Sequence, residues 1–465
     1  MYVADSRANK APVSAEGAAR PAVAGRRLTA VAPTVLALGT VSLVTDVSSE
    51  MVTAVLPLYL VTGLGLSPLG FGLLDGIHNG FSALVRLVGG HLADRGGGRH
   101  KWVAGLGYGI SALCRPLLLV ARTLTPIGLI LAADRTGKGL RTAPRDALIS
   151  LSSTPEMRGR AFGVHRAMDT AGALLGPLAA FLILRATVDG YDAVFIVSFC
   201  VAVLGVLVLL LFVPGGRQVA RGPQVPGSPQ VPGSPQVPGS PQVPGSPQVP
   251  GSPQVPGSPQ RGAEDGGARP TLRAAVGLLR RRDLRRITLC ALLLGLATVS
   301  DSFVYLLLQR RLGVPGRWFA LLPLGTAAAF LLLAVPLGRL ADRVGRWAVF
   351  LAGHGALLLA YALLLTSWYG TALPYLVLAL HGGFYAATDG VLMAAASQGV
   401  PEALRSSGLA VVQTGQALAR FACSLLFGAA WTVWGDRAAL AGAAGALVVC
   451  ALFSVVVRPK GAVPA

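Results

Sequence analysis

Stretches of roughly 20 mainly apolar residues recur along almost the whole chain of 465 residues. A helix of that length, rising about 1.5 Å per residue, crosses the roughly 30 Å hydrocarbon layer of a bilayer. Hydrophobic residues make up 53% of the chain and charged residues only 13%, whereas about a quarter of the residues in soluble domains are charged. Most of the chain is therefore expected not to meet water. The sequence predicts an all-α polytopic membrane protein embedded in the lipid bilayer.

Twelve apolar segments have the length of a membrane span. The loops after the even-numbered segments carry most of the Lys and Arg, although Arg310, Arg311 and Arg317 lie in an opposite loop. Because basic residues are retained on the cytoplasmic side, both termini are predicted to be cytoplasmic, in a multi-pass protein of the plasma membrane. The predicted spans are 33–62, 69–93, 102–121, 125–149, 159–186, 192–213, 286–309, 317–340, 347–367, 371–397, 406–432 and 437–457.

A repeat divides the chain: PQVPGS occurs six times between Pro223 and Ser258. Pro fixes φ and removes a backbone donor, and Gly adds conformational freedom, so the repeat predicts an extended linker without packed structure. A ligand for a proline-binding domain is the other interpretation, but no flanking specificity residues support it. The predicted organisation is a disordered cytoplasmic tail (1–32), a six-helix bundle (33–214), a cytoplasmic linker (215–284), a second six-helix bundle (285–458) and a cytoplasmic tail (459–465).

The net charge of +20 would suggest nucleic-acid binding in a soluble protein. Here the basic residues cluster in alternate short loops, so no nucleic-acid partner is expected. The five cysteines are scattered within apolar segments and fit neither a disulfide framework nor metal-ligand spacing, so no metal site is predicted. No nucleophile–base pair is apparent, so we do not expect an enzyme.

The two halves of the chain resemble each other, as in many transporters built by internal duplication of six-helix units. GGHLADRGGGRHK (89–101) and its weaker copy LGRLADRVGRW (337–347) occupy matched positions, and both resemble the G-x-x-x-D-R-x-G-R-[RK] loop of the major facilitator superfamily. The resemblance covers nearly the whole chain except the tail and the repeat linker. It implies twelve helices in two pseudo-symmetric bundles, and a loop that locks their cytoplasmic ends. The residues implied in this gate are Gly90, Asp94, Arg95, Arg99, Asp342 and Arg343.

Two further motifs resemble the same family. Arg135-x-x-Lys138-Gly139 is similar to its R-x-x-Q-G motif in span four, whose Arg the family associates with proton coupling, with Lys as a departure from Gln. Gly172-x-x-x-Gly176-Pro177 in span five is similar to the core of a motif found in family antiporters. Small residues at this spacing are also ordinary in helix packing, so both interpretations of the span-five motif stay open.

The stretch DRTGKGLRTAPRD (134–146) places six ionisable side chains in the fourth predicted span. It is not a phosphate-binding loop, because it lacks a glycine five residues before Gly137 and a hydroxyl residue after Lys138. At about 100° per residue, the charges at positions 134, 138, 141 and 145 fall within about 60° of one another. A loop has no reason to preserve such a stripe. The sequence therefore predicts a continuous helix with one charged face, bent by Pro144 near its cytoplasmic end.

Other spans also carry ionisable side chains, each of which costs about 2.5–3.5 kcal/mol on insertion scales and should face a cavity or a partner. Asp46 and Glu50, four residues apart in span one, are expected to stack on one face. Two such carboxylates should not both ionise easily, and the pair can carry a proton. The candidates for proton coupling and for the central cavity are Asp46, Glu50, Asp75, His78, Arg86, Arg135, Arg141, Asp169, Asp301 and Asp389.

These features predict a proton-coupled secondary active transporter that works by alternating access and uses the proton gradient without a cofactor. The Gly-Pro element of span five favours efflux by antiport of a drug-like or amphipathic small molecule, in a bacterial drug- and metabolite-efflux-like subgroup. The cationic face of spans two and four favours instead a symporter that takes up an organic anion or metabolite. A non-transporting scaffold or receptor, holding a partner through the repeat linker, is a third interpretation. We expect a monomer whose partners are the lipid bilayer and a small-molecule substrate.

Overall fold

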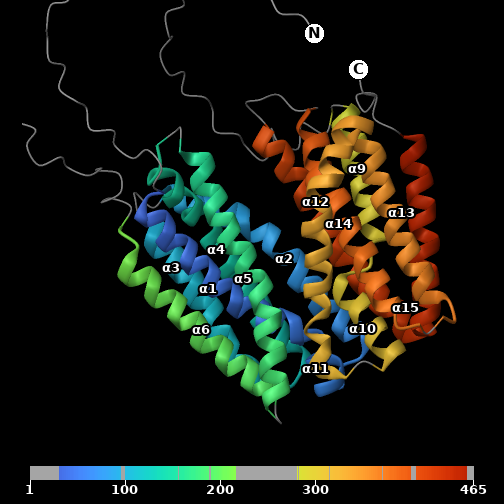
Figure 1. The fold of residues 1–465 in the computed structure, drawn as a ribbon, viewed down its shortest axis with the longest axis horizontal. Coiled ribbons are helices and arrows are strands. Elements are labelled where there is room, and N and C mark those ends of the chain that lie inside the picture. Colours follow the sequence, from blue (N-terminus) through green and yellow to red (C-terminus); the bar gives the residue numbers. More distant parts are fainter. Residues whose placement is uncertain are drawn as a thin grey trace, which may run out of the picture.

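The chain folds into helices in a computed structural model, which describes residues 31–95, 100–154, 157–187, 190–215, 280, 282–313, 315–368, 370–398 and 405–457. Two bundles lean against each other (Figure 1). The first contains six long helices, and a π-helical turn (η1, Tyr59–Gly63) continues the first of them. Their bounds are α1 (Pro33–Leu58), α2 (Pro68–Arg95), α3 (His100–Val120), α4 (Leu124–Leu151), α5 (Arg158–Ala186) and α6 (Gly190–Phe212).

The second bundle contains more helical segments, because the predicted spans 286–309 and 317–340 are each divided between two helices. The last two predicted spans both lie on the final helix. Gly435, with a φ of 83°, adopts a left-handed conformation that favours glycine and divides that helix into two parts. The bounds are α9 (Arg282–Leu296), α10 (Asp301–Leu312), α11 (Gly316–Phe319), α12 (Leu322–Val344), α13 (Arg346–Leu365), α14 (Leu373–Gln398) and α15 (Arg405–Val456).

The all-helical membrane fold expected from the sequence is confirmed, and each predicted span falls on a helix or a pair of helices. Among the described residues, nine helices are long and apolar enough to cross a membrane. Neither α2 nor α4 belongs to that group, and these helices carry the polar faces seen in the sequence. The seventh span, predicted at 286–309, is observed as a candidate membrane span at Leu284–Leu312. It consists of two helices, α9 and α10, because the chain is non-helical at 298–300.

In each bundle the first helix begins and the last helix ends on the same face of the molecule, at the upper end in Figure 1. Arg310, Arg311 and Arg317, which depart from the predicted distribution of loop charges, lie near the opposite end. Two of them contact other groups of the protein there. The Arg311 guanidinium donates to the Leu363 and Leu364 carbonyls at the C-terminal end of α13. Arg310 lies over the Trp431 ring, 5.1 Å from its centroid. These contacts explain why two arginines depart from the loop asymmetry.

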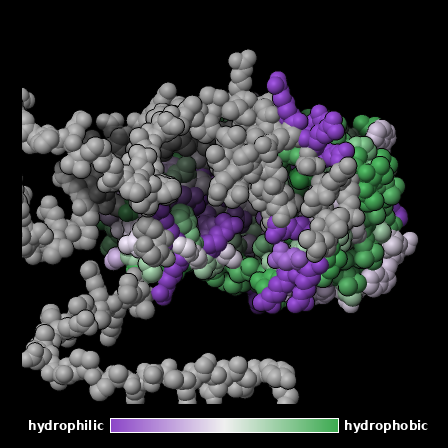
Figure 2. All heavy atoms as spheres, turned by 90° about the horizontal axis from the view of Figure 1, so that it is seen from above, coloured by the Kyte–Doolittle hydropathy of each residue, from purple (hydrophilic) through white to green (hydrophobic). Residues whose placement is uncertain are grey.

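Aromatic side chains join the two bundles at the lower end. The ring centroids of Phe71 and Phe303 are 4.9 Å apart, and those of Phe181 and Trp318 are 5.0 Å apart. Between α2 and α15 the backbones approach so closely that a Cβ atom at Gly428 would lie 2.5 Å from the Pro68 carbonyl oxygen. Seen from above, the molecule is hollowed and hydrophilic side chains lie in the hollow (Figure 2). The bundles are therefore closed against each other at the lower end and open toward the upper end.

Candidate functional site

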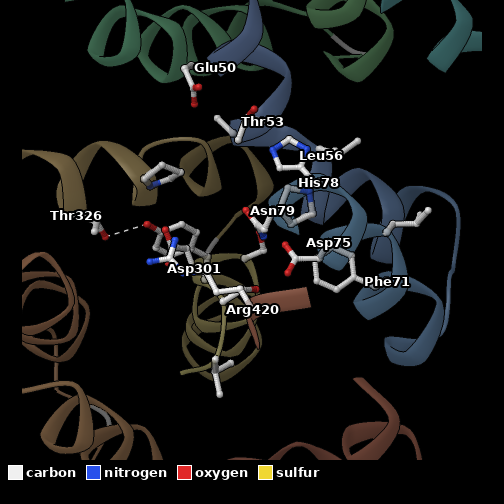
Figure 3. Close-up of a pocket in the computed structure, with 18 of the residues that line it drawn as sticks. Glu50, Thr53, Leu56, Phe71, Asp75, His78, Asn79, Asp301, Thr326 and Arg420 are labelled. Carbon is white, nitrogen blue, oxygen red and sulfur yellow. Dashed lines mark hydrogen bonds between the residues drawn. The ribbon is translucent and has the colours of Figure 1, made fainter. Parts of the chain in front are cut away.

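A cavity of about 450 Å³ lies between the two bundles. Its walls are formed by α1, α2 and α4 from the first bundle and by α10, α12, α14 and α15 from the second (Figure 3). The first bundle contributes the polar residues Glu50, Thr53, Asp75, His78 and Asn79. The second contributes Thr298, Ser300, Asp301, Ser302, Tyr305, Thr326, Tyr385, Asp389 and Arg420. A cavity of this size, with apolar walls and a few polar groups, is typical of a small-molecule site.

The break in the seventh span brings backbone groups to the cavity. Residues 298–300 leave the helix, and Asp301 is the first residue of α10. The Val299 amide donates to the Tyr361 hydroxyl at 2.8 Å, and the Cys423 thiol donates to the Thr298 carbonyl at 3.1 Å. Non-helical backbone at membrane depth is tolerated where protein groups satisfy it or where it lines a cavity. Both conditions hold at this break.

The Asp301 carboxylate stands at the N-terminal end of α10, where the helix dipole favours a negative charge. Its Oδ1 atom accepts from the Tyr385 hydroxyl at 2.5 Å and lies 3.0 Å from Nε2 of His381. His381 is fully buried in α14, so these two residues fix the position of the carboxylate at the cavity wall. Tyr385 lines the cavity beside it.

Asp75 connects the two bundles directly. It lies on α2 with only 6% of its surface exposed, and its Oδ2 atom accepts from the Ser424 hydroxyl of α15 at 2.7 Å. Figure 3 shows Asp75 beside Phe71, one helical turn away on the same helix. A buried carboxylate held by a hydroxyl group of the other bundle is suited to respond when the bundles move apart.

The charged face of α4 is buried within the first bundle. Asp134 lies between two guanidinium groups, at 3.2 Å from Arg115 of α3 and 2.8 Å from Arg135. Arg115 also donates to the Ser49 hydroxyl of α1 at 3.0 Å. All three charged side chains are at least nine-tenths buried, so this cluster connects α1, α3 and α4 away from water.

A second ionic cluster joins α1, α4 and α5. Arg141 lies 3.4 Å from the Asp46 carboxylate, and its guanidinium stacks over the Tyr108 ring at 4.5 Å from the centroid. Arg145 lies 3.1 Å from Asp146 and 3.8 Å from Asp169. The span-four stripe thus meets the carboxylates of neighbouring helices.

The glycines of span five bring α5 against the two carboxylates of α1. A Cβ atom at Gly172 would lie 3.1 Å from the Cβ of Asp46, and one at Gly176 would lie 2.6 Å from the Cβ of Glu50. Both glycines are buried, as is Pro177. The motif therefore permits close helix packing at the two positions where α1 carries an acidic side chain.

The predicted coupling and cavity residues occupy two different places. Glu50, Asp75, His78, Asp301 and Asp389 line the cavity. The others whose side chains are described belong to the ionic clusters within the first bundle: Asp46, Arg135, Arg141 and Asp169. Glu50 connects the two places, since it stands one turn from Asp46 on α1. The Arg86 side chain lies outside the described residues.

The predicted cytoplasmic gate is described only in part. The side chains of Asp94 and Arg95, and all of Arg99, lie outside the described residues, as do the tail 1–30 and the repeat linker. Gly90 is described by its helical backbone only. The backbone of α2 extends to Arg95, so the first part of this motif is helical. In the second copy, Asp342 and Arg343 occupy the last turn of α12, and Asp342 pairs with Arg346 at 3.3 Å.

Some residues of the site escaped the sequence prediction. Arg115, His381, Tyr385 and Ser424 each contact a predicted acidic residue or its ionic cluster. The cost of an ionisable group in a span could have drawn attention to Arg115 and His381. Tyr385 and Ser424 carry no such signal, because hydroxyl groups are common in membrane helices.

Two helical bundles around a polar cavity have the architecture of a membrane transporter. The family model for the Major Facilitator Superfamily matches residues 38–424 and 326–464. The chain belongs to the major facilitator superfamily.

Individual relatives match part of the chain. The chain is 35% identical over 173 residues to an uncharacterised MFS-type transporter of Methanocaldococcus jannaschii, a match that covers 37% of this chain and 42% of the relative. It is 33% identical over 204 residues to an uncharacterised protein of Mycobacterium bovis, covering 44% and 45%. The matches thus span less than half the length of these curated relatives.

Solved structures share the fold at low sequence identity. The nucleoside transporter NupG is 14% identical, with a TM-score of 0.70 over 91% of this chain and 98% of the other. A mutant of the peptide transporter POT, in complex with alafosfalin, is also 14% identical, with a TM-score of 0.70 over 94% and 96%. A bacterial Spinster homologue in an inward-facing, occupied conformation is 15% identical, with a TM-score of 0.64 over 91% and 96%. At these identities the likeness supports the fold alone.

Proposed function

We propose that the chain is a secondary active transporter that works by alternating access and exports a drug-like or amphipathic small molecule in exchange for protons. The observation that carries this proposal is the cavity of about 450 Å³ that both bundles line. The bundles meet through aromatic contacts at the lower end, such as the 4.9 Å pair of Phe71 and Phe303. Rocking of one bundle against the other would close the upper end and open the lower end around a fixed site.

Proton coupling is supported by the arrangement of carboxylates on α1. Asp46 pairs with Arg141 in an ionic cluster, whereas Glu50 faces the cavity one turn further along. A proton on Asp46 would remove the charge that holds Arg141 and would loosen the contact between α1 and α4. Substrate at Glu50 and a proton at Asp46 would therefore act on the same helix. The sequence has no nucleotide-binding motif that would supply another energy source.

The direction of transport is proposed from the charges of the fourth span. Organic-anion uptake was suggested by the cationic face of spans two and four. Arg135 and Arg141 instead pair with Asp134 and Asp46 inside the first bundle. This pairing argues against an anionic substrate and leaves the Gly-Pro element of span five in favour of efflux. The loop charges favour a plasma-membrane protein whose upper end is cytoplasmic, so that this conformation would open inward. A monomer is sufficient for this mechanism, because one chain lines the cavity from both sides.

Everted membrane vesicles test this function. An imposed pH gradient, acid inside, should be dissipated when a transported compound is added to vesicles that contain the wild-type protein. Vesicles with Asp46→Asn should not respond. Uptake of an organic anion by whole cells, without any response in vesicles across the same compounds, would support the symporter instead.

A deletion of residues 223–260 separates transport from a scaffold function. A transporter should keep its ΔpH response after the deletion, because every predicted span stays intact. A scaffold should lose its partner. Loss of transport in a deletion variant that still reaches the membrane would contradict the proposed linker function.

A further inference from the structure

The central cavity is lined by an excess of carboxylates. Glu50, Asp75, Asp301 and Asp389 reach it, and Arg420 supplies the one guanidinium among the lining side chains that the structure describes. We propose that the substrate is an organic cation, such as an aromatic compound with a protonated amine or a quaternary nitrogen. This inference rests on the proposed transport function and adds the chemical class of its substrate.

The buried basic side chains between α1, α3, α4 and α5 are matched by acidic ones and do not line the cavity. Five basic and five acidic side chains form this set. The basic ones are Arg115, Arg135, Lys138, Arg141 and Arg145, and the acidic ones are Asp46, Glu50, Asp134, Asp146 and Asp169. Lys101 of α3, which donates to the Leu210 carbonyl, and the exposed Arg166 of α5 lie outside it. Because this set is balanced among the described residues, it offers no surplus of positive charge to an anionic substrate.

The remaining cavity carboxylates are not balanced in this way. If Glu50 is counted with the first bundle, where Lys138 interacts with it electrostatically, three carboxylates still stand against Arg420. Asp75 is held by a neutral hydroxyl group, and no ion pair holds the exposed Asp389 within the described part of the chain. These three carboxylates outnumber the positive charges with His381 protonated beside Asp301, and only protonation of His78, which also lines the cavity, would make the two equal. An anion would therefore meet repulsion, while a cation would be stabilised in this partly desolvated space.

The walls between these carboxylates are aromatic and aliphatic. Phe71, Tyr305, Phe330 and Tyr385 line the cavity, together with leucines of α1, α2 and α4. Aromatic faces attract cations, and the attraction strengthens as water is removed. Their hydrophobic surface would bind the apolar part of the same molecule. An amphipathic cation satisfies both kinds of wall, whereas an inorganic cation would use only the carboxylates.

This chemistry also gives a simple exchange. Protonation of the cavity carboxylates would oppose cation binding, in addition to the effect of a proton on Asp46. Protonation from one side of the membrane would therefore release the cation, and deprotonation would allow it to bind again. Exchange of one monovalent cation for one proton moves no net charge across the membrane. Such an exchange should respond to a pH gradient rather than to the membrane potential.

Binding to the purified full-length protein in detergent tests the charge preference. Rhodamine 6G is an organic cation and fluorescein is an anion with the same xanthene ring system, so the pair compares opposite charges on a common aromatic framework. We expect saturable binding of rhodamine 6G and none of fluorescein. Asp389→Asn should raise the Kd for rhodamine 6G about ten-fold or more. Asp192→Asn, which neutralises a carboxylate in the first turn of α6 and outside the cavity, should leave the Kd unchanged.

Three results would overturn the inference. The first is a preference for fluorescein. The second is an equal effect of the two Asp→Asn variants. The third is the absence of saturable binding by rhodamine 6G, ethidium and tetraphenylphosphonium alike.

Transport in proteoliposomes separates the two proposals. If anionic or neutral compounds dissipate the pH gradient and cations do not, the cation proposal fails and proton-coupled transport stands. If rhodamine 6G binds with the expected charge preference but no compound dissipates the gradient, proton coupling fails and the substrate class stands.

Discussion

The packing of α5 on α1 leaves no room for a side chain at Gly176. A methyl group there would lie 2.6 Å from the Cβ of Glu50 and 2.9 Å from the Val47 carbonyl oxygen. Ordinary carbon contacts are about 3.5–4.0 Å, so α5 would have to move away by about 1 Å. Overpacking of this kind costs about 1–3 kcal/mol. Gly176→Ala should therefore lower the free energy of unfolding by that amount.

Gly163→Ala is the matched control, because it makes the same chemical change on the same helix at a position with nothing within 4 Å. That variant should be neutral or up to about 1 kcal/mol more stable, since Ala is the better helix former. Thermal denaturation of both purified variants in detergent measures the difference. Gly176→Ala should unfold several degrees below wild type. Equal melting temperatures for the two variants would refute the close packing of α1 and α5.

Three further predictions concern the buried polar groups. Asp134→Asn should lower the free energy of unfolding by about 3–5 kcal/mol in thermal denaturation, because it leaves two buried guanidinium groups without their carboxylate. Asp146→Asn makes the same change at a partly exposed site, and an equally small loss of stability in both variants would contradict this prediction. Tyr361→Phe should cost about 1–3 kcal/mol by the same assay, because the Val299 amide loses its acceptor; an unchanged melting temperature would show that the hydrogen bond is dispensable. Asp46→Asn should abolish substrate transport driven by a pH gradient in proteoliposomes while rhodamine 6G binding persists, and loss of both would indicate that Asp46 belongs to the binding site.

Hydrophobic length and charge patterning were sufficient to predict the helical spans. The first span was predicted at 33–62 and is observed at 33–63, and the fourth was predicted at 125–149 and is observed at 124–151. The fourth span was also the most informative, because helical spacing alone places Asp134, Lys138, Arg141 and Arg145 on one face. A single helix fixes its own periodicity, so these features follow from local sequence.

Contacts between helices could not be predicted in the same way. Helical spacing aligned Asp46 with Glu50, but it could not reveal that Arg141 binds the first while the second lines the cavity. The break at 298–300 was also missed, since Gly295 lies before it and no proline marks it. The groups that satisfy its backbone come from α13 and α15, more than 60 residues further along the chain. Local propensity contains no information about such partners.

The interrupted seventh span has a consequence for how the protein is made. At about 1.5 Å per residue, α9 with 15 residues and α10 with 12 are each about 18–23 Å long, shorter than the hydrocarbon layer. The residues that satisfy the backbone between them, Tyr361 and Cys423, are synthesised later. When α10 leaves the ribosome, the amide and carbonyl groups at the break therefore have no permanent partners. We expect this span to become resistant to protease and to hydrogen exchange only after the last helices have been synthesised.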